Sequence, residues 1–312
     1  MGDYMKRIKT VFNSVIFIFA LSVSIVAVTY ILSPKIPSFY KEKKLDVVFF
    51  GTSQSYCSFD PKVFDEYGLK TYNRGRQQQT MNYTYYYVKD ALDSCNIDVA
   101  VVEIFGMFYE DGDERFADKD IRDSTLNEMK YDKAKLQAII KCVPRSEQIS
   151  YLFPLDKYHG RWEEWKDESL KEILEPYYEE EDRGFVRKTE QVMCTDDYWS
   201  IAFSEVRRNV NEKNLESLEK IYELCQKRGV KLVLVKAPLP CYDRVIEETN
   251  TIQDWADERG IELINYMRLQ DVLEMNFYTD SLDGGVHLNE IGAKRVSKHL
   301  AQHLKEHYFD HN

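Results

Sequence analysis

The stretch Val47-Val48-Phe49-Phe50-Gly51-Thr52-Ser53 determines the expected fold. Its four consecutive apolar residues, two β-branched and two aromatic, predict a strand of the buried kind found in parallel sheets. The run ends at Gly51, which permits a sharp turn and leaves Ser53 beyond the strand end. Because ligands of open α/β sheets bind outside the carboxyl ends of the strands, the Ser53 hydroxyl is a candidate functional group. Taken alone, the tripeptide also fits an ordinary strand-to-loop turn.

The surrounding sequence predicts repeated β-α-β units, which are typical of a parallel sheet with right-handed crossovers. Strands are expected at 45–50, 69–72, 98–105, 230–235 and 261–264. Helices are expected from Asp60-Pro61, at 80–92, 214–227 and 247–259, and from the cap residue Asn289 to His303. Gly229 and Gly260 lie at the ends of two of these helices, as glycines at helix C-termini do. Between about 109 and 210 clustered charges and short helices predict a mostly helical insertion.

The N-terminus carries an uncharged apolar segment, 11–32, which is long enough as a helix to span roughly 30 Å of hydrocarbon. Lys6, Arg7 and Lys9 precede it and favour a cytoplasmic N-terminus with an exported remainder. A cleaved signal peptide is the rival interpretation, but the apolar run is long and no clear small-x-small cleavage site precedes Ser33-Pro34. We therefore expect residues 1–10 in the cytoplasm, an uncleaved anchor at 11–32, a linker at 33–44 and one domain at 45–312.

Composition excludes some functions. A formal net charge of -11 leaves no basic stripe to neutralise phosphates and argues against a nucleic-acid partner. The six cysteines are widely spaced and contain no Cys-x-x-Cys pair, which argues against a zinc ribbon or a thioredoxin-type site. Buried free thiols are expected, and one or two disulfides stay open for an exported domain.

A second candidate element lies near the C-terminus, in the segment from Tyr278 to Ala293. His287 lies in a glycine-containing loop before a helix, with Asp280 and Asp283 shortly upstream. Such a loop can place a carboxylate on imidazole Nδ1 and leave Nε2 to accept a proton from a serine. The alternative is that Asp283-Gly284-Gly285 is a turn, that Asn289 is a helix cap and that His287 is incidental.

Together the two elements resemble the SGNH (GDSL-like) hydrolase superfamily, in which a serine follows the first strand and an Asp-x-x-His element precedes the last helix. Gly51-Thr52-Ser53 matches the first block, and Asp283 to Asn289 followed by Gly292-Ala293 looks like the last. The resemblance is closest to the membrane-anchored cell-envelope branch, with the D-alanyl-lipoteichoic-acid biosynthesis protein and alginate O-acetyltransferases. It implies a three-layer, flavodoxin-like α/β/α domain.

The resemblance also implies roles for individual residues. Ser53 would be the nucleophile, His287 its general base and Asp283 the orienting acid. Asp280 is the alternative acid, because Asp283 lies four residues before His287, whereas the family has an interval of three. The oxyanion would be held by backbone N–H groups of Ser53 and Gly75.

The family's Gly-x-Asn-Asp block is absent, since residues 102–106 contain no asparagine. The missing oxyanion donor would come from Asn73 or the run 77–79. Inside the insertion, His159 and Arg161 belong to a segment that looks like a Tyr-His-x-Arg-Trp element of the envelope branch. They are candidate substrate-binding residues. The alternative is a surface turn anchored by Trp162. His299, His303 and His307 recur every four residues and are interpreted as a solvated helix face rather than a metal site.

The sequence therefore predicts serine-dependent acyl transfer or ester hydrolysis outside the membrane, with no metal and no cofactor. The resemblance implies a cell-surface glycan or teichoic-acid-like polymer as substrate and a membrane-bound O-acyltransferase as partner. The alternative function is a catalytically weak, SGNH-like partner or glycan-binding protein for such a transferase.

Overall fold

The structure, a computed structural model, describes residues 2–32, 36–110, 119–153, 180–193, 203–239, 243–284 and 286–310. The chain divides into two compact units, one comprising 1–35 with 143–176 and the other comprising 36–142 with 177–312. The candidate catalytic residues Ser53, Asp283 and His287 all belong to the second unit.

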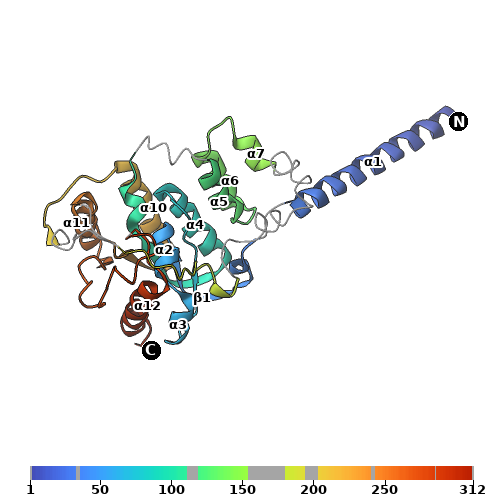
Figure 1. The fold of residues 1–312 in the computed structure, drawn as a ribbon. Coiled ribbons are helices and arrows are strands. Elements are labelled where there is room, and N and C mark those ends of the chain that lie inside the picture. Colours follow the sequence, from blue (N-terminus) through green and yellow to red (C-terminus); the bar gives the residue numbers. More distant parts are fainter. Residues whose placement is uncertain are drawn as a thin grey trace. The chain divides into compact units, whose positions relative to one another are not determined.

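The first unit contains the N-terminal helix α1, Gly2–Leu32, and the short helix α7, Gln148–Leu152 (Figure 1). Within α1, residues Tyr4–Thr29 are long and apolar enough to cross a membrane. This agrees with an apolar span at the N-terminus, although the helix begins well before residue 11. By length and composition, a membrane anchor and an N-terminal signal sequence both fit this helix.

The second unit is built on a five-stranded sheet in the order β2-β1-β3-β4-β5, in which every neighbouring pair is parallel. The strands are β1 Lys44–Phe50, β2 Thr71–Asn73, β3 Asn96–Glu103, β4 Lys231–Lys236 and β5 Glu262–Asn265. The predicted α/β class is confirmed. The chain leaves β1 for β2 on one side and then returns across β1 to β3, so the strand order reverses beside β1. Ligands of open α/β sheets bind at such a reversal point.

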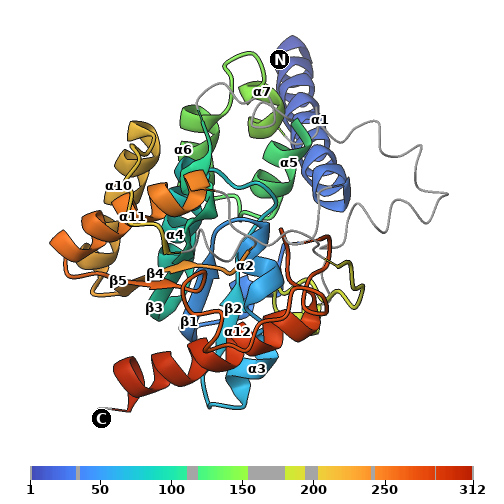
Figure 2. The same ribbon diagram turned by 60° about the vertical axis from the view of Figure 1, so that its left-hand side comes forward.

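Helices cover both faces of the sheet (Figure 2). One face carries α2 Ser53–Ser58, α3 Pro61–Asp65 and α12 Glu290–Leu304, and α12 packs against both short helices. The other face carries α4 Met81–Ser94, α10 Glu212–Arg228 and α11 Asp243–Glu258. Glu219 of α10 accepts a hydrogen bond from Trp255 of α11 and pairs with Arg259, the residue after α11. The described part of region 109–210 also contributes α5 Lys119–Asn127 and α6 Lys133–Cys142 to this unit.

Short helical turns complete the second unit. They are η1 Ser38–Lys41, η2 Ile104–Phe108, η5 Glu180–Asp182 and the π-helical turn η7 Lys305–Phe309. Gly229 directly follows α10 and Gly260 lies two residues after the end of α11; their positive φ values, +69° and +62°, confirm the predicted helix ends. Asn289 caps α12 as predicted, since its Oδ1 accepts from the N–H groups of Ile291 and Gly292.

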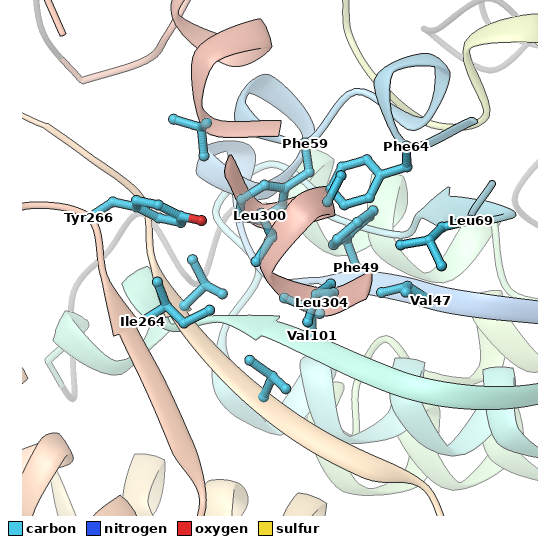
Figure 3. Packing of buried hydrophobic residues seen from close by; sticks show 14 of the residues in the cluster. Val47, Phe49, Phe59, Phe64, Leu69, Val101, Ile264, Tyr266, Leu300 and Leu304 are labelled. Atoms are coloured by element: carbon cyan, nitrogen blue, oxygen red, sulfur yellow. The ribbon is translucent and has the colours of Figure 1, made fainter. Parts of the chain in front are cut away.

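The core between the sheet and α12 is continuous and apolar (Figure 3). Alternate strand residues, among them Phe49 and Val101, face Leu300 and Leu304 of the helix. Phe49 also contacts Phe59, with 5.0 Å between ring centroids. This packing fixes α12, and with it the loop that directly precedes the helix, against the carboxyl end of β1.

The described cysteines are free thiols. They are Cys57, Cys95, Cys142 and Cys225, while Cys194 and Cys241 lie outside the described residues. Burial raises the pKa of Cys225 to about 12 and the pKa of Cys57 likewise to about 12. The structure therefore agrees with the interpretation of Cys225 as a buried, unreactive thiol.

Candidate active site

Ser53 begins a helix rather than standing at the tip of a turn. Thr52 is the N-cap of α2, and its Oγ1 accepts from the N–H of Gln54 at 3.2 Å. The expected turn at Gly51 is present, but the helix was not predicted, because a short helix of mostly polar residues, Ser53–Ser58, carries no apolar periodicity that sequence inspection could detect. The first N–H groups of a helix have no partner within it, so the Ser53 N–H points out of the helix end.

Gly51 makes the turn before Ser53 possible. Its φ is +131°, and an added Cβ would lie 2.7 Å from the carbonyl oxygen of Glu103. The backbone just after β1 therefore approaches the end of the neighbouring strand β3 more closely than any residue with a Cβ allows. This contact brings the nucleophile candidate to the carboxyl edge of the sheet.

Ser53, His287 and Asp283 form one hydrogen-bonded chain. His287 Nε2 lies 2.7 Å from Ser53 Oγ, and His287 Nδ1 lies 2.6 Å from Asp283 Oδ2. The other carboxylate oxygen, Asp283 Oδ1, accepts from the backbone N–H groups of Val286 at 3.0 Å and His287 at 2.9 Å. Gly284, with φ +87°, lets the chain turn between the two side chains. The four-residue interval is therefore compatible with a carboxylate on Nδ1.

These bonds set the charge state of Asp283. Partial burial would raise its pKa, but the hydrogen bonds from the His287 side chain and from two backbone N–H groups outweigh burial and hold the pKa below its usual value. Asp283 is thus an anion at neutral pH. An anion on Nδ1 fixes the proton there and leaves Nε2 as the acceptor that faces Ser53 Oγ.

Asp280 has a different environment. It is fully buried, accepts from the N–H of Asn276 at 2.9 Å and from the Thr279 hydroxyl at 2.8 Å, and pairs with Arg295 at 3.1 Å. These contacts stabilise the loop before α12. Asp283, and not Asp280, is the carboxylate that contacts the imidazole of His287.

The three predicted oxyanion donors differ in availability. In the part of the chain that the structure describes, the Ser53 N–H has no hydrogen-bond acceptor. The Gly75 N–H donates to Asn73 Oδ1 at 2.9 Å. Asn73 is fully buried, its Nδ2 donates to the carbonyls of Ser55 and Phe59, and its Oδ1 also accepts from Ser55 Oγ.

The assignment of Asn73 as a donor therefore needs correction, because both of its amide N–H bonds are engaged inside the protein. Gly75 could serve only by giving up its bond to Asn73. The run 77–79 follows Arg76, whose backbone N–H donates to the Gly51 carbonyl at 3.0 Å, close to the turn before Ser53. Its buried residue Gln79 accepts from the Thr84 hydroxyl.

Sequence reasoning missed a buried charged pair that contacts Thr52 and Gln54, the two chain neighbours of Ser53. Glu103 at the end of β3 and Lys236 at the end of β4 are both fully buried, with 3.6 Å between Oε1 and Nζ. Gln54, the residue after Ser53, accepts from Lys236 Nζ at 2.6 Å. The sequence did carry a signal for this pair. Each of the two charged residues is the last residue of an apolar strand, and the carboxyl ends of parallel strands are where ligand sites form.

The remaining candidates lie elsewhere. His159 and Arg161 fall outside the described residues. The interpretation of His299 and His303 as solvated was wrong: both are half-buried, with His299 Nδ1 3.1 Å from the Tyr266 hydroxyl and His303 Nε2 2.7 Å from Glu262. Among the described residues, no group of three or more His, Cys, Asp or Glu side chains is arranged to hold a metal ion.

No family model matches this sequence, and no curated protein matches it. Solved structures that match this chain include a proposed acylhydrolase from Bacteroides fragilis, with 12% identity, a TM-score of 0.40, and coverage of 88% of this chain and 90% of that one. Another is a GDSL-like lipase from Bacteroides thetaiotaomicron, with 12% identity, a TM-score of 0.39, and coverage of 90% and 95%. At this level of similarity, function has to be inferred from the residues of the site itself.

Proposed function

We propose that this protein is a serine-dependent acyl-transfer enzyme of SGNH type, either an ester hydrolase or an O-acyltransferase. One observation carries the proposal: the continuous hydrogen-bonded chain from Ser53 Oγ through His287 to Asp283, assembled from two ends of the sequence. A serine hydroxyl is a weak nucleophile by itself, and a base held on its oxygen by an oriented carboxylate is the arrangement that activates it.

In the proposed reaction, Ser53 Oγ attacks the carbonyl carbon of an ester while His287 Nε2 takes the hydroxyl proton. Asp283 stabilises the imidazolium that forms, and the Ser53 N–H donates to the developing oxyanion. The tetrahedral intermediate collapses, the alcohol leaves with the proton from His287, and an acyl-Ser53 ester remains. Water or an acceptor hydroxyl then attacks this ester with His287 again as base, which releases the acid or the transferred ester.

The proposed setting is the outer side of a cell membrane. The apolar helix α1 supports an anchor, and the basic residues Lys6, Arg7 and Lys9 before its apolar part favour an N-terminus on the cytoplasmic side. The proposed acceptor is a cell-surface glycan or teichoic-acid-like polymer, with a membrane-bound O-acyltransferase as partner. This finer assignment rests on the resemblance of the Ser53 and His287 motifs to the cell-envelope branch.

A second candidate function, a catalytically weak partner or glycan-binding protein, is favoured by the oxyanion donors. Among the three predicted donors, only the Ser53 N–H lacks an acceptor within the described residues. The side-chain amide of Asn73 donates to backbone carbonyls, and the Gly75 N–H donates to Asn73 Oδ1. Removal of one oxyanion donor from a hydrolase slows it by roughly a hundredfold or more. Slow turnover by an intact Ser-His-Asp chain is therefore compatible with either function.

Labelling with a fluorophosphonate probe separates these functions. The full chain in detergent should be labelled on the peptide that contains Ser53, whereas Ser53→Ala and His287→Ala should lose labelling. His307→Ala, which changes an exposed histidine on the C-terminal turn, is the matched control and should be labelled like the wild type. A wild-type protein that resists labelling, or a Ser53→Ala variant that is labelled equally, rejects the enzyme and favours the binding function.

A further inference from the structure

A buried lysine contacts Gln54, the residue that follows the proposed nucleophile. Lys236 ends β4 with its side chain fully removed from solvent, which lysines rarely tolerate unless they are paired. Its Nζ donates to Gln54 Oε1 at 2.6 Å and to the Ala237 carbonyl at 2.8 Å, and lies 3.6 Å from Glu103 Oε1. The reaction proposed above assigns no step to this cation.

Glu103 supplies the opposite charge and a second link to the nucleophile turn. Its Oε2 accepts from the Thr52 hydroxyl at 3.1 Å, and its Oε1 accepts from the Phe105 N–H at 3.0 Å. Burial raises the pKa of Glu103, while the Lys236 ammonium and these hydrogen bonds act in the opposite direction. A buried pair of this kind is tolerable only when its remaining hydrogen-bonding positions are filled, as they are here.

Gln54 connects this pair to the histidine loop. Its Oε1 accepts from Lys236, and its Nε2 donates to the Val286 carbonyl at 2.8 Å. The orientation of the amide is fixed by chemistry, because an ammonium can only donate and a carbonyl oxygen can only accept. Lys236 therefore determines which edge of Gln54 faces the histidine loop.

The ends of this network flank the two proposed reacting groups. Thr52 and Gln54 are the chain neighbours of Ser53, and Val286 is the chain neighbour of His287. The network thus connects the backbone on both sides of the serine to the backbone that carries the histidine, across 234 residues of sequence. Reacting groups displaced by about 1 Å can lose roughly a hundredfold in rate.

We propose that Lys236 is a positioning residue, which acts through Gln54 to hold the His287 loop in register with Ser53. The expected effect on catalysis rests on the proposed function. The effect on the geometry of the His287 loop does not, and it can be tested without catalysis. Lys236 and Gln54 together form a buried brace between the sheet edge and the loop.

Two variants test the brace. Lys236→Met removes the ammonium at similar length. Gln54→Glu keeps the acceptor for Lys236 but replaces the N–H donor that holds Val286, so it interrupts the brace without leaving Lys236 unpaired. Lys231→Met changes the exposed lysine at the start of the same strand and is the matched control. Should Lys236→Met fail to fold, Gln54→Glu still provides the test.

The first measurement is the rate constant of fluorophosphonate labelling, together with kcat and KM for a 4-nitrophenyl ester. Both brace variants should lower the labelling rate constant and kcat by roughly 10- to 100-fold with KM within about twofold of wild type. Lys231→Met should leave all three unchanged. A Gln54→Glu variant with wild-type labelling and kcat overturns the proposal.

The second measurement is amide hydrogen exchange of the peptide that covers 282–288. In the intact loop the N–H of Leu282 is bonded to the His287 carbonyl, and those of Val286 and His287 are bonded to Asp283. Faster exchange is expected in both brace variants and not in Lys231→Met. Unchanged exchange in Gln54→Glu overturns the proposal, even if the wild type shows no labelling. If the wild type is not labelled but the variants exchange faster, only the enzymatic function is rejected.

Discussion

Asn73 Oδ1 accepts a hydrogen bond from the backbone N–H of Gly75 at 2.9 Å. The resemblance to SGNH hydrolases would assign this same N–H to the oxyanion hole, so the group is already bonded within the protein. The same asparagine bonds the carbonyls of Ser55 and Phe59. It thus ties the loop after β2 to the helix that begins with Ser53. Its observed contacts therefore hold α2 in place rather than leave the amide available to a substrate oxygen.

Replacing Asn73 tests this role. Asn73→Ala should lower the free energy of unfolding by roughly 3 kcal/mol, because buried carbonyls and the Ser55 hydroxyl lose their partner. Chemical denaturation of the full chain in detergent measures the loss. Asn82→Ala, at an exposed position on α4, is the control and should change stability by less than about 0.5 kcal/mol. Equal stability of the two variants would contradict the assignment.

The two aspartates before His287 should separate by phenotype. Asp283→Asn should reduce kcat for an ester by roughly a thousandfold or more, since the imidazole loses the anion that fixes its tautomer. Asp280→Asn should mainly lower the melting temperature, because it weakens the pairing of a fully buried carboxylate with Arg295. Steady-state kinetics and thermal unfolding of both variants decide the question. A larger loss of kcat in Asp280→Asn would reassign the acid.

Gly51 should not tolerate a side chain. Gly51→Ala combines an unfavourable φ of +131° with a Cβ placed 2.7 Å from the Glu103 carbonyl oxygen, and should cost about 4 kcal/mol of unfolding free energy. Gly68→Ala is the matched control: its φ is +78°, but no atom lies within 4 Å of its added Cβ, so the expected cost is about 1 kcal/mol. Comparable costs in denaturation experiments would show that crowding at Glu103 is unimportant.

Acid stability should depend on Glu262. Its pKa lies below the usual 4.5, primarily because His303 donates a hydrogen bond to it, with a further bond from the Tyr308 hydroxyl. Since the folded pKa is lowered, the unfolded chain binds the proton more readily, and the stabilisation is complete above pH 4.5 and is lost as pH falls through the folded pKa.

The measurement compares wild type with Glu262→Gln. Their difference in unfolding free energy should shrink as the pH falls below about 4.5. A difference that stays constant down to about pH 3 would falsify this linkage. Glu258→Gln changes an exposed glutamate at the end of α11 and should show no comparable pH dependence.

Much of the scaffold could be predicted because it depends on local patterns. Apolar runs such as Val47 to Phe50 indicate buried strands, and glycines such as Gly229 indicate helix ends. The helix that begins at Ser53 could not be predicted in this way. Its six residues are held by the Thr52 cap and by Asn73, and these contacts are not visible in periodicity.

By itself the sequence determined the parallel α/β class, the apolar N-terminal helix and the candidate residues Ser53, Asp283 and His287, since these follow from residue type and spacing. Only the tertiary structure showed that Asp283 rather than Asp280 meets the imidazole and that Asn73 is engaged. It alone revealed that Lys236 reaches Gln54. The physical reason is that hydrogen bonds between distant segments depend on where the folded backbone places donors and acceptors within about 3 Å, and residue spacing does not encode that distance.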